Sequence, residues 1–294
     1  MASPPAADAA TALLARCTFA PPGTAVTCGV SGGADSLALL VLAVAAGLEV
    51  TAVHVDHGTR ADASHEADVV ADVARRFGAR FERRHVSVPR GPNLESRWRD
   101  ARHGALPPGT LTGHTADDQA ETVLINLLRG SSTDGLAGMR PGPTKPLLRL
   151  RRAETHTLCD GHGLTPVNDP TNDDPTFRRT RVRHELLPLL DAIAERDVTA
   201  LLARQADLAR DDGDLLAELA SAIDPTDARA LVAAPLPLAR RAIRAWVQGP
   251  TGHPLDAASV ERVLAVARCE ATACELPGGV RVERSGMRLR CRTT

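Results

Sequence analysis

The segment TCGVSGGADS, residues 27–36, narrows the folds open to this chain more than any other feature. An apolar strand pattern ends at Val30, two glycines follow, and a helix pattern starts directly after them. Gly32 and Gly33 can adopt positive φ angles, which lets backbone N–H groups approach an anion closely. The first turn of the helix adds unpaired N–H groups and the positive end of the helix dipole. The segment therefore predicts a strand–loop–helix unit that can hold a phosphate group.

Two other phosphate-binding patterns do not describe this loop. It lacks both the G-K-[ST] ending of a Walker A loop and the G-x-G-x-x-G spacing of a dinucleotide-binding turn. The loop therefore brings no lysine to a phosphate. Hydroxyl groups at Ser31 and Ser36 flank the glycines. A plain turn capped by serine would not explain why glycines, hydroxyls and a strand–helix context coincide.

Strand and helix patterns alternate through the first half of the chain. The expected strands cover residues 25–30, 49–55, 81–88 and 109–113, and the expected helices cover 36–46, 66–77, 94–103 and 116–129. Such alternation with apolar strands favours an α/β fold, a parallel sheet flanked by helices on both faces. Ligands of these sheets bind at the carboxyl ends of the strands.

Strand patterns fade after about residue 186, and the second half reads as mainly helical. Helices are expected at 193–222, 226–234, 236–248 and 256–268, followed by a strand pair at 280–284 and 287–291 with Gly278-Gly279 as its turn. At about 100–200 residues per domain, the length predicts two domains. We expect a catalytic α/β domain at 1–190 and a smaller, mainly helical domain at 191–294.

Charge limits the partners of the chain. Its net charge is −1, so contact with a polyanion must come from local patches. All cations are arginine except Lys145, and they cluster in residues 75–103, 178–183 and 281–292. A solvated face is the usual explanation of such a run. Three basic runs in a nearly neutral protein favour a nucleic-acid partner.

Other features argue against secretion and membrane insertion. The six cysteines form no C-x-x-C pair, and the N-terminus has no basic segment followed by an apolar core. The longest apolar run, Leu37 to Leu48, is too short to span a bilayer. We expect a cytoplasmic protein with no membrane partner.

A second group of polar residues opens the helix expected at 116–129. Asp117, Asp118 and Glu121 follow Gly113 and Thr115 at the end of a strand pattern. A helix cap and the helix dipole explain one or two acids at such a place. Asp118 and Glu121 also share one helix face, where their oxygens could bind Mg²⁺.

A metal-dependent hydrolase is the alternative suggested by His54, Asp56 and His57. H-x-D-H presents nitrogen and oxygen ligands after the second strand, and acids near His114 could complete a metal site. This alternative leaves the phosphate loop without a role.

The phosphate loop resembles the PP-loop of the N-type ATP pyrophosphatases, in the form S-G-G-x-D-S. Further segments, in this order, resemble the tRNA-isoleucine lysidine synthetase family: HVDHGTR at 54–60, NLE at 93–95, TGHTADDQAET at 112–122, and DPTND at 169–173 before an arginine run. The resemblance covers roughly residues 25–190. Thr59, His103 and Thr180 depart from the family pattern, which usually has leucine, an aromatic residue and asparagine there.

The resemblance implies an ATP-dependent ligase. L-Lysine would be joined to C2 of the wobble cytidine, position 34, of a tRNA-Ile with a CAU anticodon. The C2 carbonyl oxygen would attack the α-phosphate of ATP and release pyrophosphate. The lysine ε-amine would then attack C2 and expel AMP. ATP and Mg²⁺ are the implied cofactors, and fixed donors would stabilise charge on the phosphate oxygens.

The resemblance also implies roles for individual residues. The residues implied to bind ATP are Ser31, Gly32, Gly33, Ala34, Asp35, Ser36 and His54. The residues implied in catalysis are Asp35, Asp118, Glu121 and Arg181, with Asp118 and Glu121 either holding Mg²⁺ or orienting the lysine amine. The residues implied to bind tRNA are Arg99, Arg102, Arg178 and Arg183, together with the helical domain.

The geometry of the arginine run gives a separate prediction. On a helix, residues two apart diverge by about 200°, so Arg179 and Arg181 could share a face only in an extended segment. We expect a loop that enters a helix near Val182. Arg181 would then stabilise charge at the α-phosphate, and Arg178 would contact the tRNA backbone.

Two further functions stay open. A tRNA-thiolating enzyme would share the loop but would need a catalytic cysteine, whereas Cys28 and Cys159 read as buried apolar thiols. A non-catalytic RNA-binding module would bind tRNA regardless of Asp35. The sequence leaves the oligomeric state open, a homodimer included.

Overall fold

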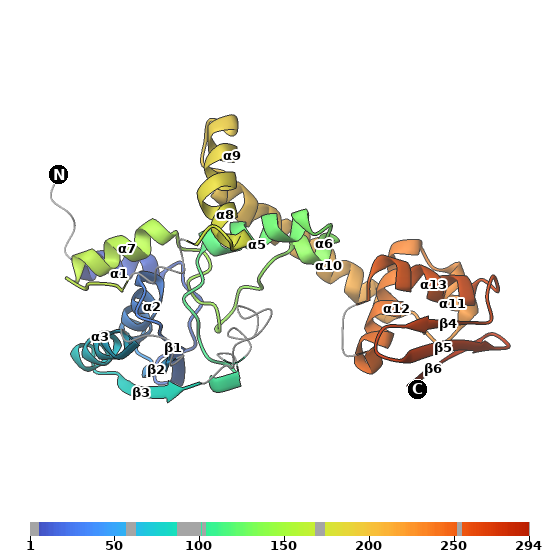
Figure 1. The fold of residues 1–294 in the computed structure, drawn as a ribbon, viewed down its shortest axis with the longest axis horizontal. Helices are drawn as coiled ribbons and strands as arrows, with labels where there is room; N and C mark the ends of the chain where they lie inside the picture. The colour runs from blue at the N-terminus through green and yellow to red at the C-terminus, as the bar shows by residue number, and fades with distance from the viewer. Residues whose placement is uncertain are drawn as a thin grey trace. The chain divides into compact units, whose positions relative to one another are not determined.

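The structure is a computed structural model, and it describes residues 6–56, 63–86, 101, 104–167, 174–251 and 255–293. The chain divides into two compact units, Met1–Asp207 and Leu208–Thr294. The division falls within the helix α10 (Thr199–Ser221), beyond the boundary expected near residue 190. Each unit is described by itself below (Figure 1).

A parallel sheet in the order β1-β2-β3 forms the centre of the first unit. The strands are β1 (Ala25–Gly29), β2 (Glu49–Asp56) and β3 (Arg80–His85). The crossovers are the helices α2 (Ala34–Ala45) and α3 (Ala63–Arg76). The predicted α/β fold is therefore confirmed. Of the strand expected at 109–113, only Leu111 pairs in parallel, with Cys28.

The burial of each element follows from its sequence. β2 is buried along most of its length, whereas β3 is rich in arginine and is more exposed. α2 is apolar on nearly all sides, a pattern typical of a helix surrounded by protein. Leu37, Leu39 and Leu40 of α2 are wholly buried in the main core.

The remaining helices of this unit lie above the strands in the view of Figure 1. They are α1 (Ala6–Leu14), α5 (Ala116–Leu128), α6 (Thr133–Leu136), α7 (Arg152–Gly161), α8 (Arg178–Arg181), the π-helical turn η2 (Val182–Leu186) and α9 (Leu187–Ala194). A second small core joins Ala120 and Leu124 of α5 to Val182, Leu187 and Val198.

The expectation of an extended arginine run is wrong. α8 is already helical at Arg178 and continues through η2 into α9 without a loop. The physical reason is that Val182 and Leu187 pack against α5, which holds this segment as one helical stretch. Consecutive arginines of the run therefore point in different directions.

The second unit combines helices with an antiparallel sheet in the order β4-β5-β6. Its elements after α10 are α11 (Ala228–Ala233), α12 (Leu236–Thr251), α13 (Ala257–Ala267), β4 (Ala273–Leu276), β5 (Val280–Ser285) and β6 (Arg288–Thr293). The predicted strand pair is present. β4 was not expected, and the Gly278-Gly279 turn, with φ of 78° and 69°, joins β4 to β5 rather than the two predicted arms.

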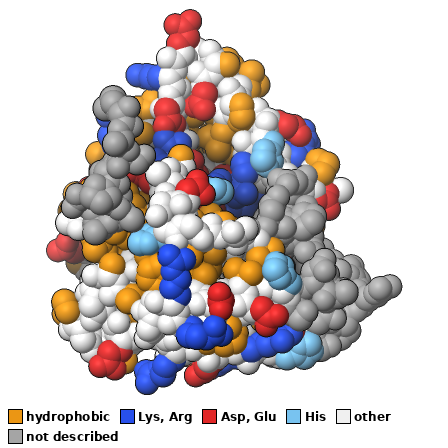
Figure 2. All heavy atoms as spheres, turned by 90° about the vertical axis from the view of Figure 1, so that its left-hand side faces the viewer, with side chains coloured by type: hydrophobic (Ala, Val, Ile, Leu, Met, Phe, Trp, Pro, Cys, Tyr) orange, Lys and Arg blue, Asp and Glu red, His pale blue; other side chains and the backbone are white. Residues whose placement is uncertain are grey.

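Acidic, basic and apolar side chains are interspersed on the face of the molecule drawn in Figure 2. None of the helices that the structure describes is long and apolar enough to cross a membrane.

Candidate active site

The phosphate loop has the strand–loop–helix geometry that the sequence predicts. It leaves β1 at its carboxyl end, and α2 begins after Gly33. Gly32 has a φ of +96°, a conformation in which other residues would be strained. The Ser36 hydroxyl donates to the Gly33 carbonyl oxygen at 2.8 Å and accepts from the Ser31 N–H at 3.2 Å. These bonds hold the loop in a tight turn at the start of α2.

The segment that follows Leu111 lies directly against this loop. A Cβ atom added to Gly113 would lie 2.5 Å from the backbone oxygen of Asp35, a distance that no side chain tolerates. Glycine at this position therefore lets the segment after Leu111 approach the first turn of α2. The approach brings the start of α5 next to the phosphate loop.

Three carboxylates from two helices gather on one guanidinium. Asp35 comes from the first turn of α2, whereas Asp118 and Glu121 come from α5. Arg152, at the start of α7, lies 3.3 Å from Asp35 Oδ2, 3.1 Å from Asp118 Oδ1 and 3.2 Å from Glu121 Oε1. The predicted acids are thus brought together, with Arg152 between them.

Two residues of the arginine run complete the group. Arg179 donates to Glu121 Oε2 at 2.6 Å and to Asp118 Oδ1 at 2.9 Å. Arg183 donates from Nε to Glu121 Oε1 at 2.7 Å. Glu121 is wholly buried, and both of its oxygens accept from guanidinium groups. We call this group the acid–arginine cluster, and its members are Asp35, Asp118, Glu121, Arg152, Arg179 and Arg183.

Asp118 also caps its own helix. Its Oδ2 accepts from the backbone N–H of Thr115 at 2.8 Å and from the Thr115 hydroxyl at 3.0 Å. The neighbouring Asp117 lies outside the cluster, because its carboxylate accepts from both Nε and Nη2 of Arg151 at 3.1 Å. One carboxylate oxygen of Asp118 therefore caps the helix, whereas the other accepts from the arginines of the cluster.

The electrostatics of the cluster follow from burial and charge. Burial raises the pKa of Asp35, although a hydrogen bond from Thr155 and the charge of Arg152 oppose this. Burial also acts to raise the pKa of Asp118, but the charges of Arg152 and Arg179 outweigh it and lower that pKa. Both acids therefore depend on Arg152 to carry their charge.

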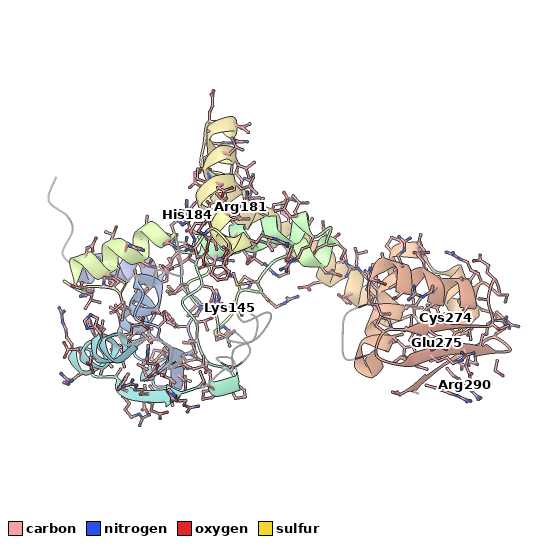
Figure 3. All side chains as sticks on the ribbon, viewed as in Figure 1. Lys145, Arg181, His184, Cys274, Glu275 and Arg290 are labelled. Atoms are coloured by element: carbon pink, nitrogen blue, oxygen red, sulfur yellow. The ribbon has the colours of Figure 1, made fainter. Side chains whose placement is uncertain are left out.

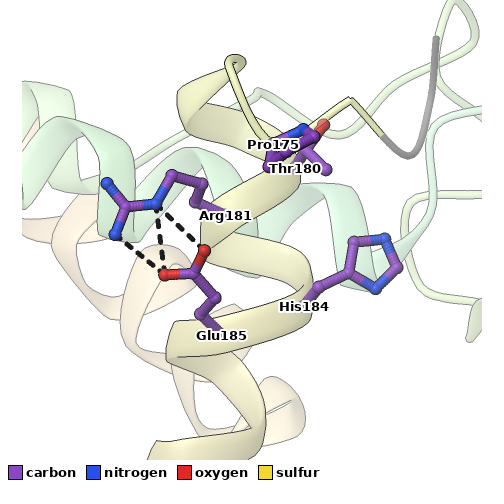
Figure 4. A pocket seen from close by; sticks show the side chains of 5 residues that line it. All are labelled: Pro175, Thr180, Arg181, His184 and Glu185. Carbon is purple, nitrogen blue, oxygen red and sulfur yellow. Dashed lines mark hydrogen bonds and ion pairs between the residues drawn. The ribbon is translucent and has the colours of Figure 1, made fainter.

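Arg181 does not join this cluster. It is exposed and donates from Nη2 to Glu185 Oε2 at 2.8 Å. Figure 4 shows this pair beside an open hollow of about 170 Å³, which is lined by Pro175, Thr180, Arg181, His184 and Glu185. Arg178 is exposed as well. The arginines of the run that reach the acids are Arg179, which we did not single out for this role, and Arg183, which we expected on tRNA.

Arg152 is the main residue that the sequence analysis missed. It is the second of two arginines at the start of α7, where the helix dipole disfavours positive charge. Two arginines at the N-terminus of a helix indicate an acidic partner elsewhere in the fold. The sequence therefore held a signal for Arg152.

His54 lies beside the phosphate loop, and its binding of ATP stays a prediction. Its Nδ1 is 3.0 Å from the carbonyl oxygen of Val30, the last residue before the loop. The side chain is buried, and its Nε2 has no hydrogen-bond partner within the described residues. The carbonyl can only accept, so Nδ1 carries the proton of this bond.

Those candidate metal ligands that the structure describes do not group into a metal-hydrolase site. Asp56 accepts from Arg83 at 2.6 Å, and His57 lies outside the described residues. Within the part of the chain that the structure describes, no three His, Cys, Asp or Glu side chains are grouped to hold a metal ion. Asp118 and Glu121 accept from guanidinium and N–H donors, and their binding of Mg²⁺ stays a prediction.

Several predicted residues fall outside the described residues. They are Arg99, Arg102, Thr59, His103 and the segments 93–95 and 169–173. Thr180, the third departure from the family pattern, is buried in α8.

Comparison with known proteins identifies the family. The sequence matches the PP-loop domain family over residues 8–190. It is 43% identical over 254 residues to a tRNA(Ile)-lysidine synthase of Nocardia farcinica, covering 79% of this chain and 80% of that relative. The chain belongs to the tRNA(Ile)-lysidine synthase family. The resemblance seen in the sequence is thereby confirmed.

A second member of the lysidine synthase family extends the match. The protein of Thermobifida fusca is 37% identical over 289 residues, covering 90% of this chain and 89% of that relative. The similarity therefore reaches into the second unit.

A solved structure shares the fold. The U34-tRNA thiolase NcsA from Methanococcus maripaludis, with its [4Fe-4S] cluster, has a TM-score of 0.53 and 17% identity, covering 69% of this chain and 79% of that one. At this identity the likeness shows a common PP-loop fold. A chain of the lysidine synthase family with this fold uses ATP.

Proposed function

We propose that this chain is an ATP-dependent ligase that joins L-lysine to C2 of the wobble cytidine in a tRNA-Ile with a CAU anticodon. The observation that carries the proposal is the meeting of Asp35, Asp118 and Glu121 beside the phosphate loop, in a member of the lysidine synthase family. The loop fits an anionic nucleotide, and the acids fit a cationic amine.

The chemistry has two steps. The C2 carbonyl oxygen of the cytidine attacks the α-phosphate of ATP, which forms an O-adenylated base and releases pyrophosphate. The deprotonated ε-amine of lysine then attacks C2 and expels AMP. Negative charge accumulates on phosphate oxygens in the first step, so fixed N–H and O–H donors are the main catalytic tools of this chain.

We assign nucleotide binding to the phosphate loop and to His54 of β2. Free N–H groups at the start of α2 and the dipole of that helix favour the phosphates. The residues that we assign to ATP are Ser31, Gly32, Gly33, Ala34, Asp35, Ser36 and His54.

We assign binding of the lysine ammonium group to the acids of the cluster. Glu121 and Asp118 accept from three guanidinium groups, which supports a site for positively charged N–H donors. The ammonium group of lysine belongs to the same chemical class. We therefore assign Asp118 and Glu121 to lysine orientation rather than to Mg²⁺. Any Mg²⁺ would reach the site on the phosphates of ATP, which are its usual ligands in such enzymes.

The arginine run divides into two groups. Arg179 and Arg183 face the acids, and their charges position Glu121. Arg178 and Arg181 face solvent, where they can contact the tRNA backbone. We assign Arg99, Arg102 and the residues after 190 to tRNA binding as well. Arg181 can stabilise charge on the α-phosphate only if its bond to Glu185 breaks.

The alternative of base thiolation is not favoured. Burial raises the pKa of both Cys28 and Cys159 to about 12, which keeps these thiols protonated and unreactive. The curated relatives reported above are named for lysidine formation.

A direct assay tests the proposal. The protein is incubated with ATP, radiolabelled L-lysine and a CAU-anticodon tRNA-Ile, and label in the tRNA is counted. Label that depends on ATP supports the ligase, and ATP-independent turnover of a substrate would support a hydrolase. The Asp35→Ala variant is the control, because it should bind tRNA yet transfer no lysine. We place the reaction in the cytoplasm with its tRNA, and sedimentation would test whether the chain forms a homodimer.

A further inference from the structure

The phosphate loop has no positively charged side chain to balance the phosphates of ATP. ATP brings several negative charges, but residues 25–36 contain no lysine or arginine. The guanidinium groups of the acid–arginine cluster already bind Asp35, Asp118 and Glu121. Another cation at this edge of the sheet would balance the phosphates.

We propose that Lys145 is that cation and that its ammonium group binds the triphosphate of ATP. The inference rests on the ATP dependence of the proposed function. It assigns a role to a residue outside the loop and outside the acid–arginine cluster. Lys145 is the only lysine in a chain whose other cations are arginine.

Backbone contacts place Lys145 at the carboxyl edge of the sheet. The carbonyl oxygen of Thr144 accepts from the N–H of Thr112 at 2.9 Å and from its hydroxyl at 3.2 Å. Thr112 precedes Gly113, which lies against the backbone of Asp35. A short chain of contacts therefore links Lys145 to the first turn of α2. Figure 3 shows Lys145 on the side of the sheet where the strands end.

The backbone around Lys145 is fixed. Its N–H donates to the carbonyl oxygen of Gly142 at 2.9 Å, which closes a tight turn. The next residue, Pro146, is buried, and its carbonyl oxygen accepts from the N–H of Thr18 at 3.1 Å. Leu147 is wholly buried in the main core. Binding at Lys145 would thus cost little ordering of the backbone.

The side chain of Lys145 is available for an anion. It is half-buried, and within the described residues no carboxylate or other acceptor engages its ammonium group. An ammonium group is a compact charge with three donors, and it serves elsewhere as a phosphate ligand. Arg149, four residues further on, is exposed and provides a matched cation on the same segment.

Equilibrium binding of ATP is the first test. A charge-assisted hydrogen bond contributes about 1.5–3 kcal/mol, so Lys145→Gln should weaken ATP binding by roughly 10- to 100-fold. Lys145→Arg should recover part of this loss, because it keeps the charge. Arg149→Gln should bind ATP like the unmodified protein. Equal affinity for ATP in Lys145→Gln and Arg149→Gln would overturn the proposal.

The lone lysine allows a chemical test that does not depend on activity. The aldehyde of pyridoxal 5′-phosphate condenses with an amine to an imine and water, and borohydride then supplies hydride to form a stable secondary amine. We expect this reagent to label Lys145 and ATP to protect it, as read by peptide mass mapping. The N-terminal amine is the internal control, since ATP should not protect it.

The two tests separate this inference from the proposed function. ATP protection of Lys145 without lysine transfer to tRNA would refute the ligase and keep the phosphate contact. Lysine transfer with unprotected labelling of Lys145 would keep the ligase and refute the contact.

Discussion

Arg179 donates its Nε–H to Oε2 of Glu121 at 2.6 Å, although the two residues lie 58 positions apart in the chain. The bond joins α8 to α5 and supplies one of the partners of a carboxylate that is wholly buried. A buried charge is stable only while its partners remain, because removing them leaves it without solvation. The cluster is therefore both the proposed lysine site and a structural joint.

Glu121→Gln should lower stability as well as activity. The substitution removes a negative charge on which three guanidinium groups converge, and these are themselves partly exposed, so we expect a loss of about 2–3 kcal/mol. Urea unfolding measures the loss. Glu185→Gln, in an exposed pair with Arg181, is the matched control and should leave the unfolding midpoint almost unchanged. Equal effects of the two variants would show that the cluster has no structural role.

Asp35→Asn should stabilise the protein while it removes lysine transfer. The folded pKa of Asp35 lies above its ordinary value of 3.8, chiefly because of burial. Its contribution to stability is present below that ordinary value and is lost as pH rises through the folded pKa. A neutral amide avoids this loss at pH 7. Thermal unfolding between pH 3 and pH 7 should show a flatter pH dependence for the variant.

The control for that experiment is an aspartate whose pKa is shifted in the opposite direction. Hydrogen bonds from Ser259 lower the pKa of Asp256, the cap of α13. Its contribution is present at neutral pH and is lost as pH falls, so Asp256→Asn should destabilise the protein at pH 7. If Asp35→Asn also destabilises at pH 7, burial does not govern Asp35.

Arg179→Gln and Arg181→Gln should affect different quantities. Arg179→Gln removes a contact to Glu121 and should lower both the maximal rate and the stability. Arg181→Gln should instead weaken tRNA binding and reduce its salt slope by about 1. Rates at saturating tRNA and binding at several salt concentrations distinguish them. A lower maximal rate for Arg181→Gln alone would restore the assignment of Arg181 to the α-phosphate.

Gly113→Ala should disrupt the approach of the two strand ends. The added Cβ would meet the backbone of Asp35 at 2.5 Å, and backbone atoms cannot rotate away as a side chain would. We expect a loss of about 1–3 kcal/mol and weaker ATP binding. Gly161→Ala, at the end of α7 with open space around it, should be neutral or slightly stabilising. Calorimetry with and without ATP compares the two variants.

Periodicity and turn residues predicted most of the fold because they are local signals. The apolar runs of β1, β2 and α2 allow little besides buried strands and a buried helix. β4 was not expected, since the four residues ACEL are too short to show a period and pair only through β5. The 109–113 segment was expected as a strand and gives one bridge, because Gly113 turns toward α2.

The acid–arginine cluster was predictable only in part. Asp118 and Glu121 show their common face in the sequence, because they lie three residues apart on one helix. Their cationic partners come from α7, α8 and η2, and no local pattern pairs segments that are more than 30 residues apart. The choice of Arg179 over Arg181 depends on where α8 begins, which Val182 and Leu187 set by packing on α5.

The small core around Val198 limits how the gene could be cut or recombined. Val198 and Leu202 follow α9, yet they pack with Ala120 and Leu124 of α5, the helix that carries two of the three cluster acids. A fragment that ends after α9 would expose this apolar surface and leave α5 poorly supported. Exchange of C-terminal units between relatives is therefore easiest at a crossover inside α10, where one helix can be spliced to another without opening a core. The two units of this enzyme are thus connected through the middle of a helix and not by a linker.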